Sequence, residues 1–152
     1  MKTFNLYILA AAITVVSSNV LAADKYVDPI QNKIDEQHSI LVKKYQKTCK
    51  ARNRISCQFE AQDRAEEDIP SRGSVAYSKK NYASYTSAQA KEKLKELVSI
   101  YDKLDGQSKS SWDGKLTQIN IESEIRWLMS HKLGQSAPDI YSAKLYLGLP
   151  LR

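Results

Sequence analysis

The two cysteines are the residues of this chain whose type and spacing point most directly to chemistry. Cys49 and Cys57 are the first and last residues of the segment CKARNRISC. In one unbroken helix their Cα atoms would lie about 12 Å apart along the axis, whereas a disulfide requires roughly 4.4–6.8 Å. A disulfide therefore predicts a turn, and residues 52–54 (Arg-Asn-Arg) suit it because asparagine accepts the left-handed conformation that ends many helices. We expect the bond, with Ser56 capping the next helix; two free buried thiols are the alternative.

Other side chains that could serve catalysis are few and isolated. The chain has two histidines, of which His38 lies inside a helical pattern, and His131 lies near a helix end, where a cation is stabilised without any catalytic role. Glu122 and Glu124 diverge by about 200° on a helix, so Glu122 is better placed to pair with Arg126. Zinc needs about four nitrogen or sulfur ligands. We predict no catalytic residue, no metal site and no cofactor, while an active site assembled from distant residues stays open.

The N-terminus has the pattern of a secretory signal. Lys2 precedes an apolar run from Phe4 to Val16, and small residues follow at Val20-Leu21-Ala22. The run is shorter than the roughly 20 residues that span a bilayer, which disfavours a membrane anchor. We predict a cleaved signal over residues 1–22 and a single helical domain over 23–152, with no transmembrane segment after cleavage. Export to the bacterial periplasm, or full secretion, would place the cysteines where disulfides form.

The charge balance narrows the class of partner. The chain carries 23 Lys and Arg against 17 Asp and Glu, a formal net charge of +6, to which the predicted signal contributes only Lys2. A basic balance in the cytoplasm would suggest nucleic acid. After export it favours an acidic protein, phospholipid head groups or an anionic envelope polymer, and we predict no nucleic-acid partner. Ordinary solubility is the simpler explanation.

Hydrophobic periodicity predicts an all-α, single-domain bundle of about five helices. The first helix should begin near Asp28-Pro29, and the others should cover residues 56–68, 87–105, 112–133 and 139–147. The first two form an N-terminal hairpin stapled by the disulfide. The apolar tail 147–151 should pack against the bundle, with a docking peptide as the alternative.

The helix over residues 112–133 is apolar on two sides, which is typical of a central, buried helix. One arc and its opposite consist of Trp112, Leu116, Ile119 and Trp127, and of Ile121, Ile125 and Leu128. The alternative is that one arc is a partner or dimer interface, so a homodimer stays open.

Two stretches are candidates for binding a partner. In residues 70–86 tyrosines, which favour contact surfaces, alternate with lysines; the candidates are Tyr77, Lys79, Lys80, Tyr82 and Tyr85. The alternative is a short helix that packs its tyrosines onto the bundle. The far end of the first helix carries a basic cluster, of Lys43, Lys44, Lys47, Lys50, Arg52 and Arg54. Arg52 and Arg54 join the predicted contacts, and a solvated charged face is the alternative.

Together these features predict a rigid, exported protein that binds another protein in the cell envelope. The most concrete version is an inhibitor, or immunity-like protein, directed against a cell-wall enzyme or toxin with an acidic cleft. An envelope stress or chaperone-like protein with an apolar concave face is the first alternative. An enzyme that acts on an envelope polymer is the second.

Overall fold

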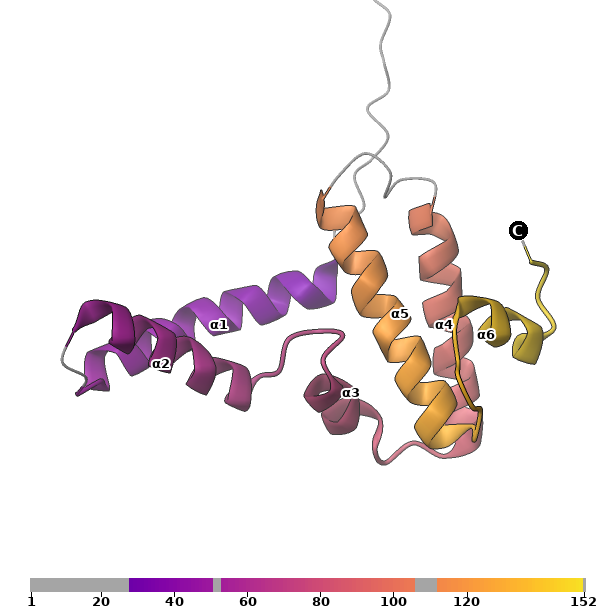
Figure 1. Cartoon of the computed structure of the whole chain (residues 1–152), viewed down its shortest axis with the longest axis horizontal. Helices are drawn as coiled ribbons and strands as arrows, with labels where there is room; N and C mark the ends of the chain where they lie inside the picture. The colour runs from indigo at the N-terminus through magenta and orange to yellow at the C-terminus, as the bar shows by residue number, and fades with distance from the viewer. Residues whose placement is uncertain (1–27, 51–52, 106–111, 152) are drawn as a thin grey trace, which may run out of the picture.

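The computed structural model describes residues 28–50, 53–105 and 112–151, so the predicted signal peptide 1–22 lies outside it. The described chain forms six helices and no strand, which confirms the all-α prediction; they are α1 (Pro29–Thr48), α2 (Arg54–Asp68), α3 (Val75–Tyr82), α4 (Ser87–Asp105), α5 (Trp112–Lys132) and α6 (Ile140–Leu147). The helix beyond the predicted five is α3, in the stretch 70–86. Figure 1 shows α1 and α2 as a hairpin that projects from a body made of α3 to α6.

The ends of the hairpin helices are fixed by side-chain caps. Asp28 accepts hydrogen bonds from the backbone amides of Ile30 and Gln31, with proline in the first turn, as predicted. At the other end Asn53 accepts the backbone amide of Ser56 at 2.8 Å. The prediction that Ser56 caps α2 is wrong, because Asn53 provides the cap and the helix begins one residue after it.

The hairpin is closed at its free end by the predicted disulfide. Cys49 and Cys57 are bonded, with their Cα atoms 5.6 Å apart. The buried apolar side chains of the two helices are few: Ala61 and Ala65 on α2, and Ile34 on α1, which belongs to the core of the body. Because the apolar contact is so limited, the covalent link matters more to this element than it would to one with a large core.

The body holds most of the hydrophobic core. α4 and α5 pack side by side, α3 packs on α5, and α6 packs on both α4 and α5. The fully buried apolar side chains come from α4, α5 and α6, and they are Ala90, Leu94, Leu97, Val98, Leu104, Ile121, Ile125, Leu128, Met129 and Ala143. In the C-terminal tail Leu147 packs against this core, while Leu149 and Leu151 are exposed.

Only one of the two apolar arcs predicted on α5 is buried along its length. Ile121, Ile125 and Leu128 are fully buried, and Trp127 is 8% exposed. Trp112, Leu116 and Ile119 are 71%, 42% and 56% exposed. The prediction that α5 is buried on both sides is therefore wrong over its N-terminal half, because the hairpin projects sideways and does not cover that face.

A buried ionic cluster joins the hairpin to the body. Arg72, in the α2–α3 connection, donates from Nη1 to Asp28 at 2.6 Å and from Nε to Glu124 at 2.5 Å. The Tyr82 hydroxyl donates to the second oxygen of Glu124. Burial alone would lower the pKa of Arg72, but Glu124 and Asp28 raise it above its ordinary value. The cluster therefore ties together the start of α1, the connection, α3 and α5.

Candidate partner-binding surface

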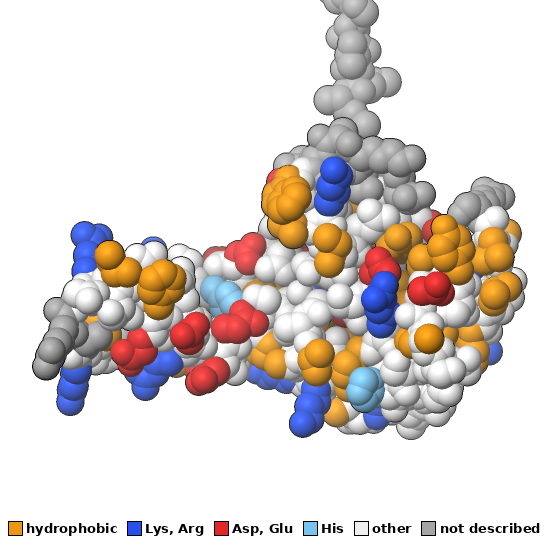
Figure 2. Space-filling view, in the orientation of Figure 1, with side chains coloured by type: hydrophobic (Ala, Val, Ile, Leu, Met, Phe, Trp, Pro, Cys, Tyr) orange, Lys and Arg blue, Asp and Glu red, His pale blue; other side chains and the backbone are white. Residues whose placement is uncertain are grey.

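The free end of the hairpin carries positive charge. From residue 43 to residue 54 the sequence has six basic residues and no acidic one. The described basic side chains of this stretch are all exposed: Lys43, Lys44, Lys47, Lys50 and Arg54. Arg52 lies outside the described residues. Figure 2 shows Lys and Arg side chains gathered at this end of the molecule. We call residues 43–59, less the undescribed 51 and 52, the hairpin tip.

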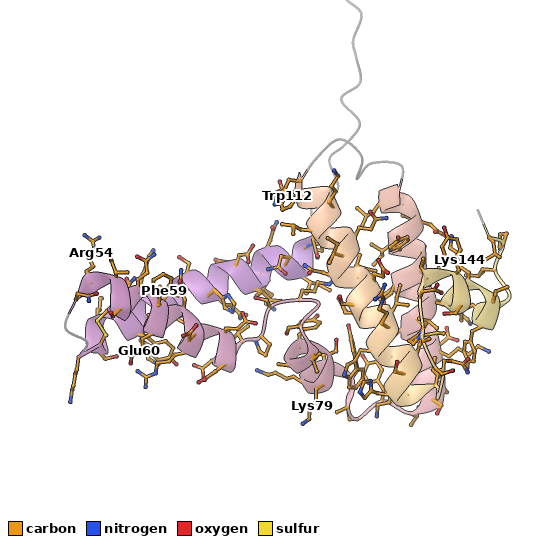
Figure 3. The ribbon with its side chains drawn as sticks, in the orientation of Figure 1. Arg54, Phe59, Glu60, Lys79, Trp112 and Lys144 are labelled. Carbon is orange, nitrogen blue, oxygen red and sulfur yellow. A yellow bond between two sulfur atoms is a disulfide. The ribbon has the colours of Figure 1, made fainter. Side chains whose placement is uncertain are left out.

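Two large apolar side chains are exposed beside these charges. Ile55 and Phe59 lie one helical turn apart on α2 and are 67% and 60% exposed. Figure 3 shows Arg54 and Phe59 on the half of α2 farthest from the body. Exposed aromatic and aliphatic anchors next to charged groups are typical of the centre and rim of a protein-binding surface.

The acids near the other end of α2 do not neutralise the tip. Glu66 accepts hydrogen bonds from the amide and hydroxyl of Ser71 at 2.8 and 2.6 Å. Asp68 accepts a hydrogen bond from the Tyr45 hydroxyl. These acids therefore serve the α2–α3 connection and the pairing of the helices. Along the sequence of the hairpin, basic residues predominate at the free end, and the acids Glu66, Glu67 and Asp68 lie at the end of α2 nearest the body.

The tyrosines predicted as contacts lie mostly in the core. Tyr77 and Tyr82 are 9% and 3% exposed, and their rings make an edge contact with centroids 6.2 Å apart. Tyr85 is half-buried, and the centroid of its ring lies 5.3 Å from that of Tyr82. Burial raises the pKa of both Tyr77 and Tyr82, with Glu124 adding to the effect. Tyr77 and Tyr82 therefore follow the alternative, a short helix that packs its tyrosines, and are not offered to a partner in this conformation.

The remaining predicted contacts are exposed but not gathered in one place. Lys79 and Lys80 lie on the outer side of α3, and Lys80 donates to the backbone carbonyl of Asp68 at 2.7 Å. Figure 3 shows Lys79 on α3, in the body, and Arg54 at the far end of the hairpin. Sequence reasoning missed Ile55 and Phe59 as surface residues, although their position just after the turn was a usable signal.

The groove between α1 and α2 is the place where an acid–base site could have formed. It holds Asp35, His38, Asp63 and Glu66. His38 Nε2 contacts the carbonyl oxygen of Ile69 and lies 3.8 Å from a Glu66 oxygen. A ring nitrogen that faces a carbonyl must carry its proton, so it is not free to act as a base. Among the described residues no group of three or more His, Cys, Asp or Glu could hold a metal ion.

Comparison with known proteins does not assign the chain to a family. No family model, no curated protein and no solved structure matches it. None of the described helices is both long enough and apolar enough to cross a membrane. We therefore infer function from the residues of the chain itself.

Proposed function

We propose that this protein binds an acidic protein of the bacterial envelope and blocks it by occlusion. The binding element is the hairpin tip, and the partner is a cell-wall enzyme or toxin, which makes the chain an inhibitor or an immunity-like protein. The observation that carries the proposal is a disulfide-closed hairpin that projects from its body with basic and apolar side chains at the free end.

The shape supports occlusion. A projecting pair of helices can enter a cleft, which a flat helical surface cannot do. The disulfide holds the tip in one conformation before binding, so less conformational entropy is lost in the complex. Phe59 and Ile55 would be the apolar anchors, and the surrounding lysines would steer the tip toward carboxylates.

The compartment supports an exported role. The predicted signal and the intramolecular disulfide both fit a compartment outside the cytoplasm. Enzymes that cleave cell-wall polymers through paired carboxylates offer an acidic cleft of the required chemistry. The tip would fill such a cleft and exclude the polymer without any reaction of its own.

A pair of charge-reversal variants tests this proposal. The tip variant changes Lys43, Lys47 and Lys50 to Glu, and the control variant changes Lys91, Lys95 and Lys103 on α4 to Glu. Both alter the net charge equally, and all six side chains are exposed.

The oxidised chain 23–152 and both variants are immobilised and exposed to envelope extract at several salt concentrations. We expect the wild type and the control variant to retain a discrete protein, which salt releases. The amount of this protein retained by the tip variant should be at least tenfold lower. An equal loss of retention in both variants would show that binding depends on net charge and not on the hairpin tip. No retained protein at any salt concentration would overturn the proposal.

A chaperone-like role is the second candidate, because large apolar side chains are exposed on several helices. They include Ile40 on α1, Phe59 on α2, Trp112 on α5 and Leu145 on α6. They are spread over separate elements and do not line one concave face. A chaperone would suppress the aggregation of unrelated unfolded proteins at similar concentrations, whereas an inhibitor would bind one partner and leave that aggregation unchanged.

A further inference from the structure

The exposed side of α5 has an ordered arrangement of apolar and charged residues. The side chains on this stripe are Trp112, Lys115, Leu116, Ile119, Glu122, Ser123 and Arg126. At about 100° per residue they fall within an arc of roughly 120°, with Ile119 at its centre. Figure 2 shows hydrophobic side chains over the N-terminal part of α5 and charged ones further along the molecule. We call these residues the α5 stripe.

The stripe is complementary to a reversed copy of itself. Trp112 and Arg126 stand equally far from Ile119, on opposite sides along the helix. Leu116 and Glu122 do the same, and Lys115 and Ser123 form a third such pair. Rotation by 180° about an axis through Ile119, perpendicular to two neighbouring helices, therefore brings each residue level with its counterpart in the second copy.

The charges agree with this arrangement. Glu122 accepts a hydrogen bond from Arg126 of its own chain at 2.5 Å, as its position on the helix predicts. Lys115 and Glu122 lie on the same flank of the stripe, so the antiparallel copy adds Lys115 of the other chain to this ion pair, twice per dimer. The Arg126 guanidinium, held by Glu122 of its own chain, comes level with Trp112 of the other chain near the centre, where its face suits a cation–π contact. A parallel pairing would instead bring the two Arg126 side chains together near the centre and would place Lys115 across from the flank that carries no acid.

We infer that two copies of this chain associate through the α5 stripe, antiparallel and with a two-fold axis at Ile119. The stripe spans about 21 Å from Trp112 to Arg126, and contact along that whole length requires the small crossing angle of about 20° seen in helix bundles. The stripe and the hairpin tip share no residue, so this inference does not depend on the proposed function.

The test measures the mass of the oxidised chain 23–152 by sedimentation equilibrium across a wide concentration range, without any other protein. We expect a reversible monomer–dimer equilibrium. Ile119→Glu should weaken the association by at least tenfold, because it places two like charges at the two-fold axis. Ile40→Glu is the matched control, since Ile40 is a comparably exposed isoleucine, at 62% against 56%, on α1. It should leave the equilibrium unchanged.

Charge reversal distinguishes the antiparallel arrangement from other contacts. Lys115→Glu should weaken the dimer, and the double variant Lys115→Glu/Glu122→Lys should regain part of that affinity, because the two charges change places while Arg126 loses its own partner. In addition, Ile119→Cys should form a disulfide between two chains under oxidising conditions, while Ile40→Cys should not.

A wild-type chain that stays monomeric throughout would overturn the inference. So would a dimer that Ile119→Glu does not weaken, or a double variant no tighter than Lys115→Glu alone. Since these measurements involve no partner protein, their failure would leave the proposal for the hairpin tip standing.

Discussion

At the scale of single residues, Arg72 connects the hairpin to the body through two buried ion pairs. Its side chain is 1% exposed, and it pairs with two carboxylates that are themselves 4% and 0% exposed, on Asp28 and Glu124. Removing one partner of a buried ion pair leaves the other charge without compensation, which costs much more than breaking an exposed pair.

We expect Arg72→Leu to lower the free energy of unfolding by roughly 3–5 kcal/mol. Arg64→Leu is the control, because Arg64 pairs with Glu60 at 3.8 Å with both side chains about half exposed; it should cost under about 1 kcal/mol. Urea denaturation followed by circular dichroism measures both values. Equal losses in the two variants would show that the buried cluster does not hold the hairpin to the body.

Tyr82 gives the same cluster a signature at alkaline pH. Burial, and then the charge of Glu124, raise its pKa above the ordinary value of 10.0. The folded state therefore holds this proton more tightly than the unfolded state. The stabilisation is complete below about pH 10 and is lost as the pH rises above it, by up to about 1.4 kcal/mol per pH unit.

Tyr82→Phe should be less stable than the wild type at pH 7, by about 1–3 kcal/mol, because Glu124 loses a hydrogen-bond donor. Above pH 10 the two proteins should converge, since phenylalanine has no proton to lose. Unfolding free energies measured between pH 7 and pH 11 check this. Curves that stay parallel across the range would contradict the role given to Tyr82.

At the scale of elements, the α2–α3 connection depends on a close approach at Gly73. Its φ is +81°, and a Cβ atom there would lie 2.7 Å from the Cα of Asn120 on α5. Both the conformation and the contact exclude a side chain. Gly148 has a φ of +68°, and a Cβ atom there would meet no other atom within 4 Å. Its substitution therefore measures the cost of the backbone conformation without a steric clash.

We expect Gly73→Ala to destabilise the protein by at least about 2 kcal/mol, and Gly148→Ala by about 1 kcal/mol, because only the first adds a clash to the strain. The midpoint of thermal unfolding measured for both variants gives the comparison. A smaller effect at Gly73 than at Gly148 would mean that the connection does not pack on α5 as described.

The disulfide should stabilise the hairpin locally. Its short loop predicts a gain of about 2–3 kcal/mol, and the two helices bury little apolar surface between them. In the double variant Cys49→Ser/Cys57→Ser we expect amide hydrogen exchange to accelerate at the free ends of α1 and α2, while α4 and α5 keep their protection. Uniform acceleration over all the helices would show that the hairpin and the body unfold as one unit.

Local rules predicted the helices well and their surroundings less well. The caps at Asp28 and the turn required by Cys49 and Cys57 depend on neighbours in sequence, so they could be read directly. The exposure of Trp112 and Ile119, and the burial of Tyr77 and Tyr82, depend on where the hairpin leaves the body. Arg72 sets that direction through partners 44 and 52 positions away in sequence, and no local pattern reveals such a pairing.

At the scale of the whole molecule, the proposed binding element is separate from the structure that supports it. The body provides the core and carries the α5 stripe, through which we infer that a second copy binds. The hairpin provides a projecting, covalently closed end with basic and apolar side chains. A pair of chains joined at α5 would carry two tips, which would strengthen binding to any partner that presents more than one cleft.

The most direct test of this account is the hydrogen-exchange footprint of the oxidised chain in complex with the protein it retains from envelope extract. We predict that protection rises over the free ends of α1 and α2, including the turns that carry Lys47 and Phe59, and stays unchanged over α3. A footprint over α3 or α6, with the tip exchanging as fast as in the free protein, would contradict it.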